Sequence, residues 1–175
     1  MENYGKIIAP GTIRFERLLP GPIERVWAYI TESDKREKWL ASGEMDLKVG
    51  GKVNLHFVHA NLSSYQETPP DKYKCYEHGN SFSGTVIQCT PPYLLTFTWG
   101  DGSEVTFELH KQEEKILLVL THRHLEAVEA RISVASGWHT HLGILVARLE
   151  RREPAGFWGV HNQMEKEYTE ILTEL

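Results

Sequence analysis

The sequence contains only two cysteines, Cys75 and Cys89, and neither stands in a CxxC or another metal-ligand spacing. This scarcity excludes a disulfide framework and argues against a zinc site, so we expect two plain thiols, as in a reducing compartment. The chain also lacks an apolar run that approaches roughly 18 residues, and its start does not join a basic segment to an apolar one. We therefore expect a cytoplasmic protein with no membrane partner.

Basic residues are also in short supply. The 19 lysines and arginines are scattered among 24 acidic residues, and the formal net charge is -5. Because phosphate binding requires clustered basic side chains, nucleic acid is not an expected partner. A hydrophobic fraction of 41% in 175 residues suits one domain with a single core, which needs no metal or cofactor to hold it together. We expect that domain to span residues 1–175.

Motifs of covalent and metal catalysis are missing. There is no GxSxG turn, Cys89 lies within a strand pattern, and neither HExxH nor CxxC occurs. The nine histidines do not form a metal site by spacing, since His139 and His141 would lie about 200° apart on a helix. We therefore predict no metal, no cofactor and no nucleophile. General acid–base chemistry by a single histidine is not excluded, because it requires no motif.

Helical patterns stand only at the two ends of a long series of strand patterns. Near the front, Ile23, Val26, Trp27 and Ile30 recur at helical spacing after Pro20-Gly21-Pro22, and a second short helix reaches Trp39-Leu40. Near the end, residues 134–150 carry a wide apolar stripe and residues 160–175 predict a further helix. The strands are expected at residues 12–17, 53–59, 82–87, 94–99, 103–109 and 116–124. Hairpin signals between several of them indicate an antiparallel meander.

One long segment between the strands carries few apolar residues. Residues 60–80 contain Pro69-Pro70 and Gly79-Asn80, which favour turns over regular elements. We expect a long loop with at most marginal structure of its own. Loops of this length serve as lids or binding loops as often as they end in a disordered tip.

Six short patterns, in this order, resemble the AHSA1-like branch of the START/SRPBCC superfamily over residues 11–152. They are the run Phe15 to Trp39 with Val26-Trp27 and Lys38-Trp39, Gly50-Gly51 before a strand, Gly84-Thr85-Val86 to Pro91-Pro92, Leu95 to Trp99, Leu120-Thr121-His122, and Gly137-Trp138 with leucines after it. The resemblance implies an α+β helix-grip fold in the order strand, helix, helix, six strands, helix. In that fold a curved antiparallel sheet wraps around the long C-terminal helix, with a hydrophobic cavity between them.

The segment after the long helix departs from the family's usual pattern. Residues 154–175 form a helical extension that would cover the sheet, close the cavity mouth or serve a homodimer. The superfamily includes lipid and hormone binders, polyketide cyclases and the C-terminal domain of an Hsp90 ATPase activator. The resemblance therefore leaves several functions open.

Alternate residues of the predicted strands form an apolar, aromatic face of the sheet, with His59, His122 and His124 at strand ends. The strand pattern alone is explained by side chains that fill a packed core. Only the sheet curvature that the family resemblance implies favours a hollow instead. In the implied fold His122 faces Trp138. The candidate ligand-binding residues are Trp39, Phe57, His59, Phe97, Trp99, Phe107, Leu118, Leu120, His122, Trp138, Leu142 and Leu145.

Three functions follow from these observations. The first is a carrier, sensor or stress-related protein that is not an enzyme and binds a small apolar ligand by desolvation. The second is an enzyme of the cyclase or hydratase kind, with His122 as the acid–base group and His59 as its helper. The third is a protein-interaction module, related to the Hsp90 activator domain, in which the extension binds a partner or a second copy. We favour the first.

Overall fold

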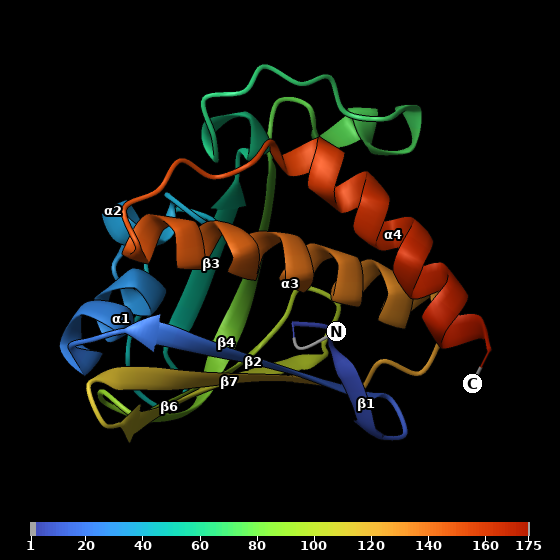
Figure 1. Cartoon of the computed structure of the whole chain (residues 1–175). Coiled ribbons are helices and arrows are strands. Elements are labelled where there is room, and N and C mark those ends of the chain that lie inside the picture. The colour runs from blue at the N-terminus through green and yellow to red at the C-terminus, as the bar shows by residue number, and fades with distance from the viewer. Residues whose placement is uncertain (1–2, 175) are drawn as a thin grey trace.

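A single curved antiparallel sheet forms the body of the protein (Figure 1). The computed structural model describes residues 3–174. Seven strands follow one another across the sheet in the order β1-β2-β7-β6-β5-β4-β3. Their bounds are β1 Lys6–Ala9, β2 Thr12–Pro20, β3 Lys52–Phe57, β4 Asn80–Thr90, β5 Leu94–Thr98, β6 Glu104–Gln112 and β7 Lys115–Arg123.

Alternation along the strands decides which face of the sheet is buried. Val105, Phe107 and Leu109 on β6 are at most 1% exposed. Because Phe107 pairs with Leu120 of β7, the inward side chains of neighbouring strands form continuous rows. The predicted parity of these strands is confirmed, and the rows provide the floor on which the helices pack.

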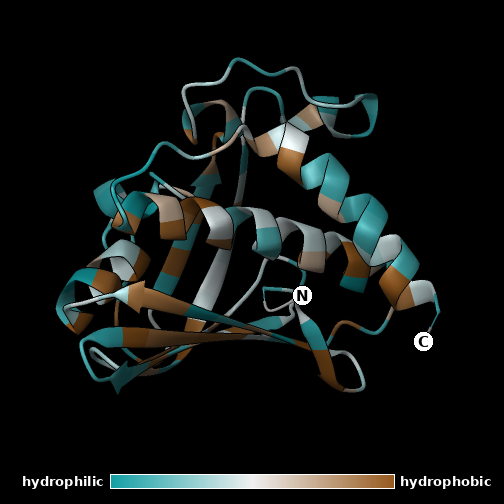
Figure 2. Cartoon of the chain, viewed as in Figure 1, coloured by the Kyte–Doolittle hydropathy of each residue, from teal (hydrophilic) through white to brown (hydrophobic). Residues whose placement is uncertain are grey.

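Helices lie on one side of this floor (Figure 1). The long helix α3, Val128–Leu149, runs across the sheet, and α4, Phe157–Thr173, crosses over α3. The short helices α1, Ile23–Thr31, and α2, Ser33–Arg36, lie at the end of the sheet where α3 terminates. Hydrophilic residues predominate along α4 in Figure 2, since only one stripe of it is buried.

The element order differs from the prediction in physically simple ways. Two strands precede α1 where one was predicted. The missed strand is β1, which is short and largely exposed and carries no alternating signal. Five strands follow α2, as the strand patterns indicate, and not the six that the family resemblance implied. Helix α3 begins at Val128, before the predicted start at Val134. The prediction rested on the apolar stripe, and no residue before Ala135 is buried enough to extend that stripe. The second helix ends at Arg36 and continues as turns to Trp39.

The expected 60–80 loop contains two short 3-10 turns, η1 His59–Asn61 and η2 Asp71–Tyr76, and is held by α4. The Glu67 carboxylate accepts hydrogen bonds from the backbone N–H groups of Trp158 (3.0 Å) and Gly159 (2.8 Å). A carboxylate at a helix N-terminus satisfies free N–H groups and complements the helix dipole. The Tyr73 ring stacks on Trp158 at 5.4 Å between centroids. The loop and the extension therefore form one packed unit.

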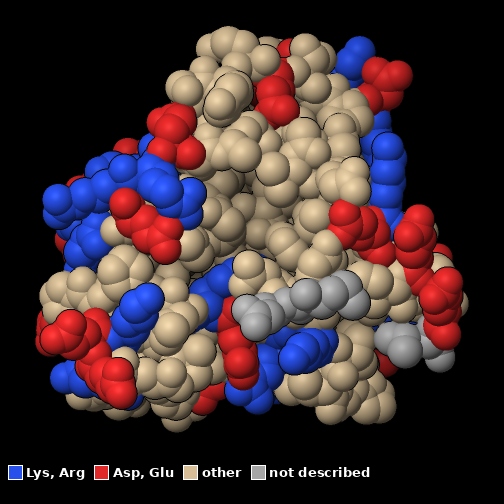
Figure 3. Space-filling model, viewed as in Figure 1, with Lys and Arg blue, Asp and Glu red and all other residues tan. Residues whose placement is uncertain are grey.

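Charged side chains of both signs are intermixed around the margins of the face in Figure 3, and its centre carries none. Within residues 3–174, no helix combines the length and the apolar character that crossing a membrane requires.

A buried arginine fixes the connection between α1 and β3. Arg36 is 0% exposed, and its guanidinium donates to the carbonyl oxygens of Ile30, Thr31, Ala41 and Gly43. Burial lowers the pKa of Arg36 to about 10, so the group remains charged at neutral pH. The guanidinium therefore supplies the donors that water would otherwise provide to these carbonyl groups, which lie at the end of α1 and in the segment that leads to β3.

Replacing Arg36 with leucine should lower the free energy of unfolding by about 3 kcal/mol or more, because several enclosed carbonyls lose their donors. Urea unfolding followed by circular dichroism measures the change. The adjacent Lys35→Ala variant is the control, since Lys35 forms only an exposed ion pair with Glu32 and should cost at most about 0.5 kcal/mol. Equal stabilities of the two variants would contradict the role assigned to Arg36.

Candidate functional site

A cavity of about 140 Å³ lies between the N-terminal half of α3 and the sheet. Trp138 and His141 point into it from α3, where their spacing of three residues puts them on one helix face. Phe57 ends β3 and Trp99 follows β5, so the opposite wall is built where two strands stop. The full lining comprises Leu40, Phe57, Trp99, His122, Ser133, Val134, Gly137, Trp138 and His141.

A second hollow of about 270 Å³ adjoins the first and extends outward to η1, η2 and α4. The two share Phe57, Trp99, Ser133, Gly137 and His141. We call the two hollows together the aromatic cleft. The outer part adds His59, Tyr73, Tyr76, Asn80, Phe82, Phe157, Trp158 and His161 to the lining.

Gly137 keeps the cleft open at its centre. A Cβ atom added there would meet no heavy atom within 4 Å. Glycine in the middle of a helix costs roughly 0.5–1 kcal/mol relative to alanine. The helix therefore carries a destabilising residue at a position where a larger side chain would project into the hollow.

His122 is held at the inner end of the cleft by a one-way chain of hydrogen bonds. The Trp138 indole Nε1–H donates to His122 Nδ1 at 3.0 Å, as expected for a histidine that faces this tryptophan. Because an indole N–H only donates, Nδ1 must carry the lone pair, and Nε2–H therefore donates to Ser103 Oγ at 2.6 Å. Ser103 in turn donates to Asp101 Oδ1 at 2.5 Å. His122 is thus fixed as the neutral Nε2–H tautomer.

Burial keeps the imidazoles of the cleft neutral. Desolvation lowers the pKa of His122 to about 4, against a smaller opposing effect of Asp101. Desolvation lowers the pKa of His59 to about 4 and that of His141 to about 3, and the charge of neighbouring histidines adds to both shifts. The pKa of His161 is also lowered, mainly by burial. At neutral pH the cleft therefore presents uncharged rings.

The imidazoles lie close to other aromatic rings. His59 stacks on Phe157 with 4.3 Å between centroids, and His141 lies 5.0 Å from the same ring. Within residues 3–174, no group of three His, Cys, Asp or Glu side chains is arranged to hold a metal ion. The arrangement suits contact with flat apolar molecules, whose edges and faces match such rings.

The structure divides the predicted ligand-binding residues into two groups. Phe57, His59, Trp99, His122 and Trp138 line the aromatic cleft. The other predicted residues pack against one another in the core, at most 1% exposed, and do not line the cleft: Trp39, Phe97, Phe107, Leu118, Leu120, Leu142 and Leu145.

Two histidines do not follow the predicted strand parity. His124 is exposed, with a φ of 68°, so it does not share a face with His122 as expected. β7 ends at Arg123, and beyond a strand the alternation no longer applies. His59 likewise follows the end of β3 and opens η1, yet this turn still leads it to the cleft.

Apart from Trp138, sequence reasoning missed the cleft residues that come from α3, and it missed those of the extension. Ser133, Gly137 and His141 form a row of four-residue spacings on α3, which marks one helix face. Phe157 and Trp158 are adjacent aromatic residues at the start of α4, whose packing depends on tertiary contacts. The helical spacing was readable from the sequence, but the position of α4 was not.

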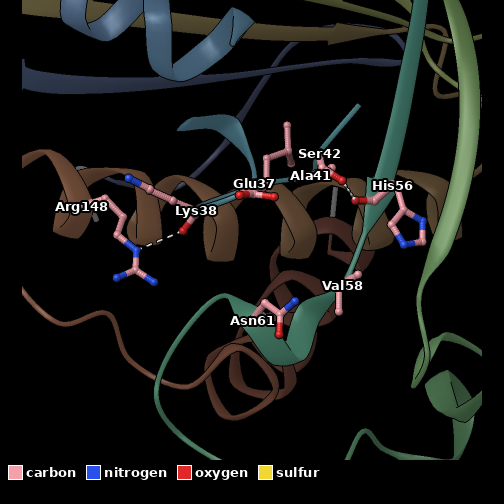
Figure 4. A pocket seen from close by; sticks show the side chains of 9 residues that line it. Glu37, Lys38, Ala41, Ser42, His56, Val58, Asn61 and Arg148 are labelled. Atoms are coloured by element: carbon pink, nitrogen blue, oxygen red, sulfur yellow. Dashed lines mark hydrogen bonds between the residues drawn. The ribbon is translucent and has the colours of Figure 1, made fainter. Parts of the chain in front are cut away.

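A separate polar pocket of about 210 Å³ lies near the C-terminal end of α3 (Figure 4). Arg148 borders it, but its Nε and Nη2 donate to the carbonyl oxygens of Lys38 (3.0 Å) and Leu62 (2.9 Å). The Ser42 hydroxyl donates to the His56 carbonyl oxygen of β3 at 3.4 Å. Arg148 therefore ties the segments that follow α2 and η1 to α3, and Ser42 ties the segment before β3 to that strand. Because these polar groups already have structural partners, this pocket is not the favoured ligand site.

Comparison with solved structures identifies relatives of the whole fold. A protein of Bordetella parapertussis, solved by solution NMR, is 43% identical over 95% of this chain and 89% of its own, with a TM-score of 0.82. A conserved protein of unknown function from Enterococcus faecalis is 24% identical over 95% and 88%, with a TM-score of 0.70. CalU16 from Micromonospora echinospora is 20% identical over 92% and 88%, with a TM-score of 0.66. No curated protein matches this chain.

The family described as "Activator of Hsp90 ATPase homolog 1-like protein" matches residues 20–150. That range contains α1, the strands from β3 to β7 and the long helix α3. The expected resemblance and helix-grip fold are therefore confirmed, and the chain belongs to the family of Activator of Hsp90 ATPase homolog 1-like proteins.

Proposed function

We propose that this protein binds a small, largely apolar molecule in the aromatic cleft and acts as a carrier or sensor. The observation that carries the proposal is the lining itself. Of the residues that line the two hollows, none is Asp, Glu, Lys or Arg. Ligand sites are typically concave and mostly apolar, with a few placed polar groups, and the cleft matches that description.

The driving force is removal of apolar surface from water. It contributes about 25 cal/mol per Å² of apolar surface buried, before the costs of ordering the ligand are subtracted. Phe57, Trp99 and Trp138 supply broad apolar faces, and their contacts with a planar guest add to this term. Because the nearby imidazoles are neutral, no charge has to be desolvated when a guest enters.

The 60–80 loop and α4 serve in this proposal as the outer wall and the lid of the cleft. Tyr73 on η2 and Trp158 on α4 stack on one another and both line the outer hollow. Glu67 ties the loop to the first turn of α4. Movement of the loop and α4 together would widen the mouth of the cleft.

Replacing Gly137 with leucine should abolish ligand binding, because the new side chain occupies the centre of the cleft. Fold stability should be retained or rise by up to about 1 kcal/mol, since glycine is a poor helix former. Binding is followed by the fluorescence of N-phenyl-1-naphthylamine, a neutral apolar dye, and by native mass spectrometry after incubation with a lipid and metabolite extract.

Gly143→Leu is the matched control. Gly143 lies on the same helix, is exposed, and also has no heavy atom within 4 Å of an added Cβ. This variant should bind the dye as the wild type does. If wild-type protein retains neither the dye nor any molecule from the extract, or if Gly137→Leu binds as well as Gly143→Leu, the proposed function is wrong.

The alternative of an acid–base enzyme with His122 is less well supported. Both ring nitrogens of His122 already have partners, and the basic lone pair on Nδ1 accepts from Trp138. A general base must have that lone pair available to the substrate. His59 remains in the cleft, but its ring stacks on Phe157.

His122 should therefore appear by ¹⁵N NMR as the Nε2–H tautomer and should not titrate between pH 8 and pH 5. Its folded pKa of about 4 lies below 6.5, the ordinary value for histidine. The neutral form therefore stabilises the fold above about pH 6.5, and this stability is lost as the pH falls toward 4. A midpoint near 6.5 in the folded protein would overturn the assignment and restore His122 as an acid–base candidate.

A further inference from the structure

His141 presents a hydrogen-bond acceptor at the junction of the two hollows. Its Nδ1 lies 2.9 Å from the Trp39 carbonyl oxygen. A carbonyl oxygen only accepts, so Nδ1 carries the proton and Nε2 carries the lone pair. The ring is 6% exposed and lines both hollows. Its tautomer is therefore set by the backbone rather than by solvent.

The Nε2 atom of His141 remains available to a ligand. It has no hydrogen-bond partner within residues 3–174, and it is not sealed from solvent. His59 differs in position, because it lines only the outer hollow, and its unpartnered Nδ1 is sealed from solvent. Since the inner hollow supplies open space beside His141, Nε2 is the imidazole acceptor that a guest of the inner hollow can reach.

The remaining polar groups of the inner hollow do not compete with His141. The two nitrogens of His122 and the Trp138 N–H are bound to one another and to Ser103. Trp99 is half-buried and Ser133 is exposed, so water can serve their polar atoms. An enclosed acceptor without a donor is costly, by about 1–3 kcal/mol. His141 is thus the polar group that a bound guest most needs to satisfy.

We propose that the guest of the aromatic cleft is a neutral, planar molecule whose hydroxyl or N–H group donates a hydrogen bond to His141 Nε2. This inference rests on the proposed function and names the chemistry of its ligand. A carboxylate has no proton to donate at neutral pH and would have to leave water for an apolar, uncharged lining. Burial holds the pKa of His141 at about 3, so the ring offers no positive charge in compensation.

Indole and benzofuran test the proposal, because they have nearly the same shape and differ by one N–H donor. Benzoate provides the anionic arm. Dissociation constants come from NMR titration of the wild-type protein at neutral pH. Indole should bind about threefold to tenfold more tightly than benzofuran, as the net value of one hydrogen bond predicts, and benzoate should bind most weakly. The ¹⁵N resonance of His141 Nε2 should move with indole and not with benzofuran.

His141→Phe keeps a ring at this position and removes the acceptor, so it should bind indole and benzofuran equally. His139→Phe is the matched control. His139 lies on the same helix, and burial lowers its pKa to about 4, but it lines neither hollow. This control should keep the preference for indole. Circular dichroism and thermal unfolding check that both variants fold, and the wild-type comparison decides the matter if His141→Phe does not.

The outcomes separate the two proposals. Equal affinity of the wild-type protein for indole and benzofuran, tighter binding of benzoate, or an unchanged preference in His141→Phe would overturn the inference while leaving an apolar cleft in place. Binding of neither neutral probe would overturn the inference, and failure to bind N-phenyl-1-naphthylamine and the extract as well would overturn the proposed function with it.

Discussion

The contact between α3 and the concave face of the sheet determines where a ligand can be held. In the C-terminal half of the helix, Leu142, Leu145 and Leu149 are at most 2% exposed and fill the space above the strands. From Val128 to Val134 no side chain is buried to that extent, and Gly137 has no side chain at all. The same helix therefore packs closely at one end and borders a hollow at the other. Because the sheet is curved, α3 can pack closely against it at one end and leave space at the other.

Much of the fold was readable from the sequence because its signals are local. Alternation in β6 and β7, and the apolar stripe after Ala135, are direct consequences of burying one face. The missed β1 pairs only with β2 and is mostly exposed, so no pattern in its own residues reveals it. The order of short family patterns then supplied the curvature, which periodicity alone does not contain.

The candidate site was only half predictable, for a physical reason. Parity separates inward from outward side chains, and it placed Phe57, Trp99 and His122 on the correct face. It does not separate an inward side chain that is covered by a helix, such as Phe107, from one that borders empty space. That distinction depends on the helix above and on α4, whose Phe157 and Trp158 close the outer side. The tautomers of His122 and His141 likewise follow from partners distant in the chain.

The attachment of the 60–80 loop to α4 has a consequence for motion. Ser64 binds Glu153 just before α4, Glu67 binds its first N–H groups, and Tyr73 both stacks on Trp158 and donates to Glu165. With contacts spread along both segments, neither can detach without exposing the polar groups of the other. The two should therefore open and close as one cooperative unit, and more slowly than an ordinary surface loop.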